Sequence, residues 1–131
     1  MPASEKNIRS RGLKRLIHAF RHSSDGLADA WRREEAFRLE TFLLVISIPL
    51  AFWLGTTISQ SLLLIFSVLF LMIVEIFNSA IEAVVDRIGP EHHELSRVAK
   101  DLGSAGVFLS ALFPVAIWGA IALGRLQFLT F

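Results

Sequence analysis

Three long apolar runs dominate the pattern of hydrophobic and polar positions along this chain. They cover roughly residues 41–58, 61–85 and 102–123. Each run is long enough to cross a bilayer, because a helix needs about 20 apolar residues to do so. Together with their flanking residues, the runs predict transmembrane helices over about 38–58, 61–87 and 98–123. The uncharged turn at residues 55–60 predicts that the first two spans are antiparallel neighbours.

A helix with one apolar face is predicted ahead of the spans, over residues 8–22. Apolar residues recur there at i, i+3, i+4 and i+7, with basic residues on the other sides; they are Leu13, Leu16, Ile17 and Phe20. This pattern is typical of a basic helix that lies on an anionic membrane surface. The alternative is a soluble helix that packs on a protein core. Residues 23–26 (SSDG) predict a turn that caps a second helix, which runs into the first span.

The central run carries polar residues that fall on one face of the predicted helix. Glu75, Asn78, Glu82 and Asp86 are spaced at i, i+3, i+7 and i+11, which forms a narrow stripe. A carboxylate near the bilayer interior costs roughly 2.5 kcal/mol or more, so residues of this kind are functional candidates by default. The stripe is therefore the first place to look for chemistry.

Turn and capping residues predict where the second and third spans meet. Gly89 and Pro90 end the central helix, since glycine suits the position after a helix and proline cannot continue it. Ser96 is predicted to cap the third span. Small residues at four-residue spacing, beginning with Ala99 and Gly103, predict close contact between helices.

The composition supports an all-α membrane protein with a single domain over residues 1–131. Hydrophobic residues make up 53% of the chain and its mean hydropathy is +0.56. The absence of cysteine excludes disulfides, thiolate metal sites and thiol nucleophiles. Because three spans enclose little interior of their own, we expect an oligomeric helical bundle.

The basic residues predict the orientation of the chain in the membrane. Nine of them precede the first span and three lie between the second and third, whereas Arg125 alone follows. By the positive-inside rule the N-terminus and the 87–100 loop are cytoplasmic, and the C-terminus is external. The acidic residues also fall on the cytoplasmic side, so any chemistry is expected at that interface. No nucleic-acid partner is expected.

Several ionisable groups are predicted to converge at the depth of the stripe. Glu34 precedes the first span, while Lys100 and Asp101 begin the third, with Ser104 one turn deeper. Carboxylate and amide oxygens suit Mg²⁺ held together with substrate phosphates, and a lysine suits a phosphate. A deeper carboxylate, partly removed from water, can act as a general base. The combination favours phosphoryl transfer to an alcohol held in the membrane.

Other interpretations of these residues remain open at this point. Glu75 and Glu82 can carry ions in a small proton or cation transporter, and Asn78 can form a simple interhelical hydrogen bond. An assembly role would need neither magnesium nor a buried Glu75. His92 and His93 lie in a polar loop, where adjacent histidines are usually solvated rather than metal-bound. No P-loop motif is present, so a nucleotide site would be of another kind.

Longer motifs resemble a known family. VEIFNSAIEAVVDRIG at 74–89, HELSRVAKDLGSAGV at 93–107 and DAWRREEAFRLE at 29–40 are similar to the prokaryotic diacylglycerol kinase family. The resemblance covers nearly the whole chain. It implies a multi-pass kinase of the bacterial inner membrane, a homotrimer with active sites shared between subunits. Its reaction would move the γ-phosphate of MgATP to diacylglycerol and give phosphatidic acid. The family also contains undecaprenol kinases, so a polyprenyl acceptor remains an alternative.

The resemblance also implies roles for individual residues. Glu75 would be the catalytic base supported by Asn78, and Glu34 and Glu82 would hold magnesium. The positions implied at the nucleotide are Arg15, His22, Glu34, Glu82, Asp86, Glu91, His92, His93, Lys100 and Asp101. Those implied at the lipid are Arg15, Trp31, Arg38, Glu75 and Ser104. At positions 22 and 92 histidine replaces an aromatic residue of the family.

Overall fold

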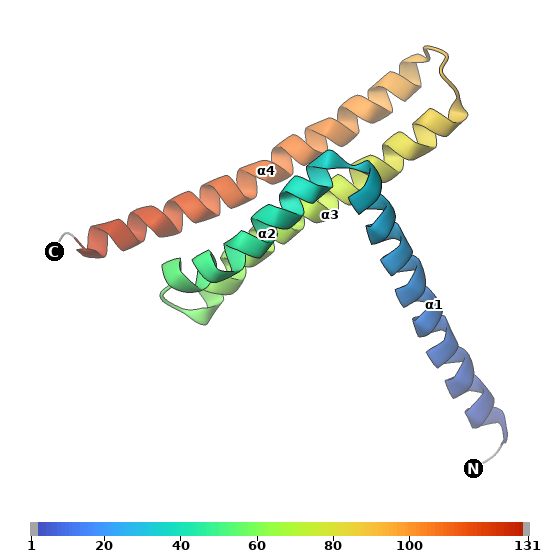
Figure 1. Ribbon diagram of the computed structural model, residues 1–131, viewed down its shortest axis with the longest axis horizontal. Coiled ribbons are helices and arrows are strands. Elements are labelled where there is room, and N and C mark those ends of the chain that lie inside the picture. Colours follow the sequence, from blue (N-terminus) through green and yellow to red (C-terminus); the bar gives the residue numbers. More distant parts are fainter. Residues whose placement is uncertain (1–2, 130–131) are drawn as a thin grey trace. The chain divides into compact units, whose positions relative to one another are not determined.

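The described residues of the protein form four helices, as a computed structural model shows (Figure 1). It describes the backbone of residues 3–129 and the side chains of residues 12–127. The helices are α1 (Ala3–Arg33), α2 (Glu35–Leu54), α3 (Ile58–Ile88) and α4 (Glu94–Leu129). No strand occurs within residues 3–129. Helix α2, helix α3 and the Glu94–Gln127 part of α4 are long and apolar enough to cross a membrane, which confirms the predicted all-α membrane class.

Helix α1 forms a compact unit by itself, separate from Glu34–Phe131. Its apolar residues at helical spacing are all exposed, with Phe20 at 76% and Leu16 at 68%. The predicted turn at residues 23–26 is wrong, because α1 continues through it without a break. The hydroxyl of Ser24 donates to the carbonyl oxygen of Phe20 at 2.9 Å, so it serves the helix already formed instead of capping a new one.

The helical conformation is interrupted at Glu34, between α1 and α2. Glu34 has an extended backbone (φ −105°, ψ 115°), and its side chain makes no capping hydrogen bond to α2. The predicted helix that runs without interruption from residue 27 into the first span is therefore wrong. The Glu34 carboxylate therefore lies at the start of the three-helix unit and does not cap α2.

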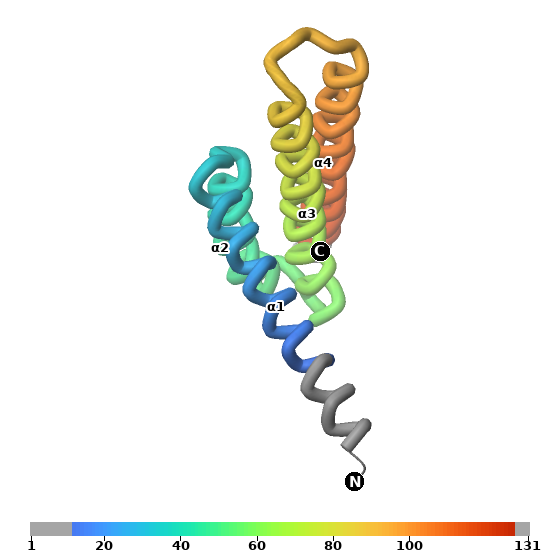
Figure 2. Tube along the Cα trace, turned by 90° about the vertical axis from the view of Figure 1, so that its right-hand side faces the viewer, coloured from blue at the N-terminus to red at the C-terminus, as the bar shows by residue number. Residues whose placement is uncertain are grey.

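Helix α3 packs against both α2 and α4 and forms the centre of the three-helix unit (Figure 2). It ends at Gly89 as predicted, and φ of 145° there suits only glycine. Helix α4 begins at Glu94, two residues before the predicted cap at Ser96. The imidazole of His93 explains this early start, because its Nδ1 accepts the backbone N–H of Leu95 at 3.2 Å.

One buried face of α3 runs the length of the unit. Its members mix serines with apolar residues along most of the helix and end in Glu75 and Asn78; they are Ser61, Leu64, Ser67, Val68, Met72, Glu75 and Asn78. Most large apolar side chains point outward instead, for example Val115 at 72% exposed and Phe66 at 56%. Such a surface suits lipid or further copies of the chain rather than water. The polar stripe thus continues the packed face of α3.

Candidate functional site

The stripe runs from the interior of the helix packing to the surface. Glu75 and Asn78 are buried, at 6% and 9% exposed, whereas the side chain of Asp86 is 65% exposed. Glu82, between them, is half-buried. The face of α3 that carries these residues is the one that meets its neighbours, so the stripe lines a helix interface. The predicted alignment of the four residues on one face agrees with this arrangement.

Asn78 links the stripe to α4. Its Nδ2 donates to Glu82 Oε1 at 3.2 Å, while its Oδ1 is buried and has no hydrogen-bond partner. Gly103 of α4 lies directly against this amide, because a Cβ at residue 103 would stand 2.3 Å from Asn78 Oδ1. The close contact predicted for the small residues of the third span is confirmed at Gly103. Its missing side chain is what admits the amide between the helices.

Four carboxyl groups gather around the buried end of the stripe. Glu75 lies within electrostatic range of Glu34 and Glu82, and Glu40 of α2 lies within range of Glu75. Glu40 is only 7% exposed, and its Oε2 has no hydrogen-bond partner. Sequence reasoning passed over Glu40. Glu40 lies three residues after Phe37, and both belong to the buried face of α2. This spacing could have identified Glu40 from the sequence.

An ion pair closes the surface end of the stripe. Lys100 Nζ lies 2.6 Å from Asp86 Oδ1, and this contact joins α4 to α3. The predicted convergence of Lys100 with the stripe therefore agrees with the structure. Asp101 behaves differently, because its carboxylate pairs with Arg97, which also binds Glu94 on the same helix. Among the described residues, no such contact brings Asp101 to the stripe.

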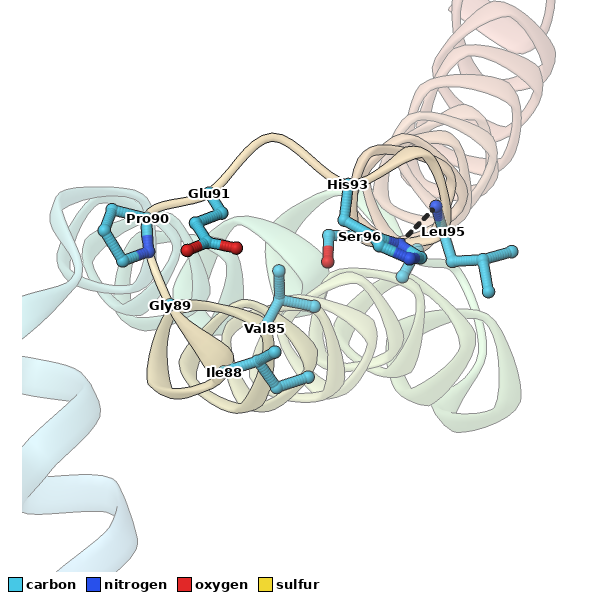
Figure 3. A pocket seen from close by; sticks show the side chains of 9 residues that line it. Val85, Ile88, Gly89, Pro90, Glu91, His93, Leu95 and Ser96 are labelled. Atoms are coloured by element: carbon cyan, nitrogen blue, oxygen red, sulfur yellow. Dashed lines mark hydrogen bonds between the residues drawn. The ribbon is translucent and has the colours of Figure 1, made fainter.

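The loop between α3 and α4 borders an open cavity of about 570 Å³. Figure 3 shows Glu91 and His93 at its edge, with Val85 and Ile88 of α3 beside it. The remaining lining residues are Gly89, Pro90, Leu95, Ser96 and Ala99. Of the loop positions implied at the nucleotide, two line this cavity, whereas His92 does not.

The other positions implied at the nucleotide and lipid lie on different elements. Arg15, His22 and Trp31 belong to α1, where the rings of His18 and His22 are 6.5 Å apart. Arg38 lies on the first turn of α2 and is half-buried. Ser104 is exposed on α4.

The carboxylate oxygens of the site suit magnesium bound together with a nucleotide, not magnesium enclosed by protein ligands alone. Within the part of the chain that the structure describes, no three His, Asp or Glu side chains are close enough to enclose a metal ion. Magnesium seldom needs such a cage, since it is usually held by one or two carboxylates together with waters and substrate phosphates. Glu34 and Glu82, which both lie within electrostatic range of Glu75, fit this second mode. Their hard oxygens fit Mg²⁺ bound with a nucleotide.

Comparison with known proteins gives a consistent result. The profile of the family described as prokaryotic diacylglycerol kinase matches residues 21–122. A protein of Haemophilus influenzae named diacylglycerol kinase is 50% identical over 113 residues, which cover 86% of this chain and 96% of that protein. The protein of that name from Escherichia coli K12 is 50% identical over 107 residues (82% of this chain, 88% of that one). A relative of the same name from Helicobacter pylori 26695 is 39% identical over 115 residues (88% and 90%).

Proposed function

This chain belongs to the prokaryotic diacylglycerol kinase family, and from that premise we propose that it transfers the γ-phosphate of ATP to the primary hydroxyl of diacylglycerol. The product is phosphatidic acid. The observation that carries this proposal is the stripe itself, which leads along one face of α3 from a buried carboxylate to the exposed Asp86, where Lys100 of α4 lies. A water-borne nucleotide and a lipid alcohol can therefore reach the same face from opposite directions.

Glu75 is the base in this proposal. The hydroxyl of a lipid reaches the buried end of the stripe from the bilayer, and the Glu75 carboxylate takes its proton. The hydroxyl oxygen then bonds to the γ-phosphorus while the bond to the ADP oxygen breaks. Asn78 keeps Glu82 in place through its amide hydrogen bond, so it supports the site without meeting the proton. A carboxylate partly removed from water is well suited to this role.

The charged groups nearer the surface bind the nucleotide in this proposal. Lys100 meets the phosphates, and a bound phosphate competes with Asp86 for its ammonium group. Glu34 and Glu82 hold magnesium, which, when bound, neutralises charge on the phosphoryl group. The cavity beside Glu91 and His93 receives the remainder of the nucleotide.

The proposed assembly is a homotrimer in the bacterial inner membrane, with active sites shared between subunits. The outward apolar surfaces of α3 and α4 support association. In the proposed orientation the N-terminus and the α3–α4 loop are cytoplasmic and the C-terminus is external. Helix α1 lies on the anionic membrane surface through its exposed apolar face.

The test is transfer of label from γ-labelled ATP to a lipid by the purified protein. We expect wild type to label diacylglycerol only when magnesium is present, and Glu75→Gln to lose turnover while it keeps MgATP binding. Glu82→Gln and Glu34→Gln should instead weaken magnesium-dependent nucleotide binding. Glu35→Gln is the matched control, since Glu35 is exposed next to Glu34. A wild-type protein that labels no lipid alcohol would refute the proposal, and inverted binding results would reverse the roles.

Undecaprenol is the competing acceptor. The relatives' names favour diacylglycerol, and an assay with both alcohols side by side decides between them.

A proton or cation transporter is less well supported, because residues 41–74 contain no charged side chain that would continue a pathway through the membrane. Ion flux into vesicles without nucleotide would favour the transporter.

A further inference from the structure

The end of the three-helix unit opposite Asp86 carries a second polar cluster that the proposed reaction does not use. We propose that this end binds the phosphate of a membrane phospholipid, with Arg125 as its principal contact. The cluster lies where the α2–α3 turn meets α4. A cavity of about 220 Å³ opens there, with Thr56, Gln60 and Arg125 as its polar lining and Leu54, Ile121 and Gly124 among its other lining residues.

Arg125 is held in place but retains most of its hydrogen-bonding capacity. Its Nη1 donates to the carbonyl oxygen of Leu54 at 3.1 Å, and its guanidinium carbon lies 5.7 Å from the centre of the Trp53 ring. The Leu54 contact fixes the arginine at the end of α2, where basic charge is favourable. A guanidinium has five N–H donors. The others remain to meet a phosphate in the fork geometry that arginine favours.

Gln60 is oriented so that its donors are the available part of its amide. Its Oε1 accepts both the backbone N–H and the hydroxyl of Thr56, each at 2.9 Å. The Nε2 group is therefore the end of the amide that is left for a ligand. Arginine and an amide nitrogen thus supply hydrogen-bond donors from two elements, and a group with several acceptor oxygens satisfies both.

No side-chain carboxylate of the described residues balances the charge of Arg125. Residues 41–74 contain no charged side chain, and Arg125 is the sole charged residue after Asp101. The first carboxylate along α3 is Glu75, which lies about 22 Å along the helix from Gln60 at 1.5 Å per residue. That separation exceeds the screening length of about 8 Å at physiological ionic strength. An anionic ligand can therefore supply a counter-charge to this half-buried guanidinium.

The position of the cluster identifies a phospholipid as the source of that charge. The turn between two membrane-spanning helices lies at the membrane boundary, where lipid phosphates are found. Trp53, which is 68% exposed at the end of α2, is the kind of residue that is enriched at this depth. The cavity is smaller than the roughly 300 Å³ or more of a typical ligand pocket, which suits a headgroup phosphate with its acyl chains left outside.

The test is lipid binding by the delipidated full-length protein, measured by native mass spectrometry. The probes are phosphatidylglycerol, galactosyl diacylglycerol as a lipid without phosphate, and inorganic phosphate as a competitor. We expect Arg125→Gln to weaken phosphatidylglycerol binding about fivefold, the factor for one arginine at a membrane surface. Galactosyl diacylglycerol should bind weakly throughout. Arg87→Gln, at the far end of α3, is the charge-matched control and should bind as wild type does.

A second variant keeps the test informative if Arg125→Gln disturbs folding. Gln60→Glu retains the oxygen that accepts from Thr56, and its charge suits the first turn of α3. It should therefore leave the unfolding temperature unchanged or higher, yet neutralise Arg125 and lose phosphatidylglycerol. Unchanged lipid binding in Gln60→Glu, or equal losses in Arg125→Gln and Arg87→Gln, would overturn the proposal. Full competition by inorganic phosphate would overturn the assignment to a lipid.

Discussion

Gly103 is the most exacting contact of the candidate site, and replacing it with alanine perturbs a single point. The added Cβ would stand 2.3 Å from Asn78 Oδ1 and 3.3 Å from Asn78 Cγ. Contacts of this length are repulsive, so something must move. If the amide rotates away, Asn78 loses its 3.2 Å hydrogen bond to Glu82. If the amide stays, α3 and α4 must separate at the level of the stripe.

Both responses have a predictable cost. Overpacking a tight contact costs typically 1–3 kcal/mol, and loss of one hydrogen bond costs about 1 kcal/mol. Inside a helix alanine is otherwise more stable than glycine by roughly 0.5–1 kcal/mol, so the net loss of stability is about 0–0.5 kcal/mol if the amide rotates and about 0–2.5 kcal/mol if the helices separate. The expected effect on turnover is larger, because a displacement of about 1 Å can cost 100-fold in rate.

The assay compares kcat and unfolding temperature across three glycine variants of α4. A Cβ at Gly106 would meet Val74 Cγ1 at an ordinary 3.7 Å, and one at Gly119 would meet nothing within 4 Å. Gly106→Ala and Gly119→Ala should therefore retain the wild-type kcat. Their unfolding temperatures should equal that of the wild type or be slightly higher. If Gly103→Ala behaves as these controls do, the close approach of Gly103 to Asn78 does not constrain the site, and the reasoning fails.

Two further predictions concern the charged groups around Glu75. Lys100→Met should raise the KM for ATP more than it lowers kcat, because the ammonium binds phosphate in the ground state. The control Lys14→Met on α1 should leave the KM for ATP unchanged. A change confined to kcat in Lys100→Met would contradict the assignment. Glu40→Met should raise the unfolding temperature, since a buried unpartnered polar atom costs about 1–3 kcal/mol, whereas Glu35→Met at an exposed position should not. A fall in the Glu40→Met unfolding temperature would mean that another copy or a ligand supplies the missing partner.

Local pattern was enough to predict three membrane-spanning helices and the alignment of the stripe, although it extended the first span to residue 58, whereas α2 ends at Leu54. A run of apolar residues must be helical inside a bilayer, because only a helix or a closed barrel satisfies the backbone there. Residues spaced three and four apart then share a face whatever surrounds the helix. The end of α3 at Gly89 was also predictable, since it rests on the backbone freedom of one residue type.

The sequence did not predict the helix boundaries correctly where a serine hydroxyl can form more than one hydrogen bond. The sequence at 23–26 favours a turn, yet the Ser24 hydroxyl binds within α1 and the break falls at Glu34. Similarly, His93 rather than Ser96 caps α4. Such choices depend on which hydrogen bond forms in the folded chain, and a local pattern allows several.

The sequence by itself determined that acidic residues line one face of a membrane-spanning helix. Only the tertiary structure decided that Glu40 joins them, that Lys100 pairs with Asp86 while Asp101 pairs with Arg97, and that Gly103 makes room for Asn78. The physical reason is that helical periodicity fixes neighbours within a helix, whereas contacts between helices depend on their rotation and separation. Those two quantities follow from packing of the whole unit, which no single segment encodes.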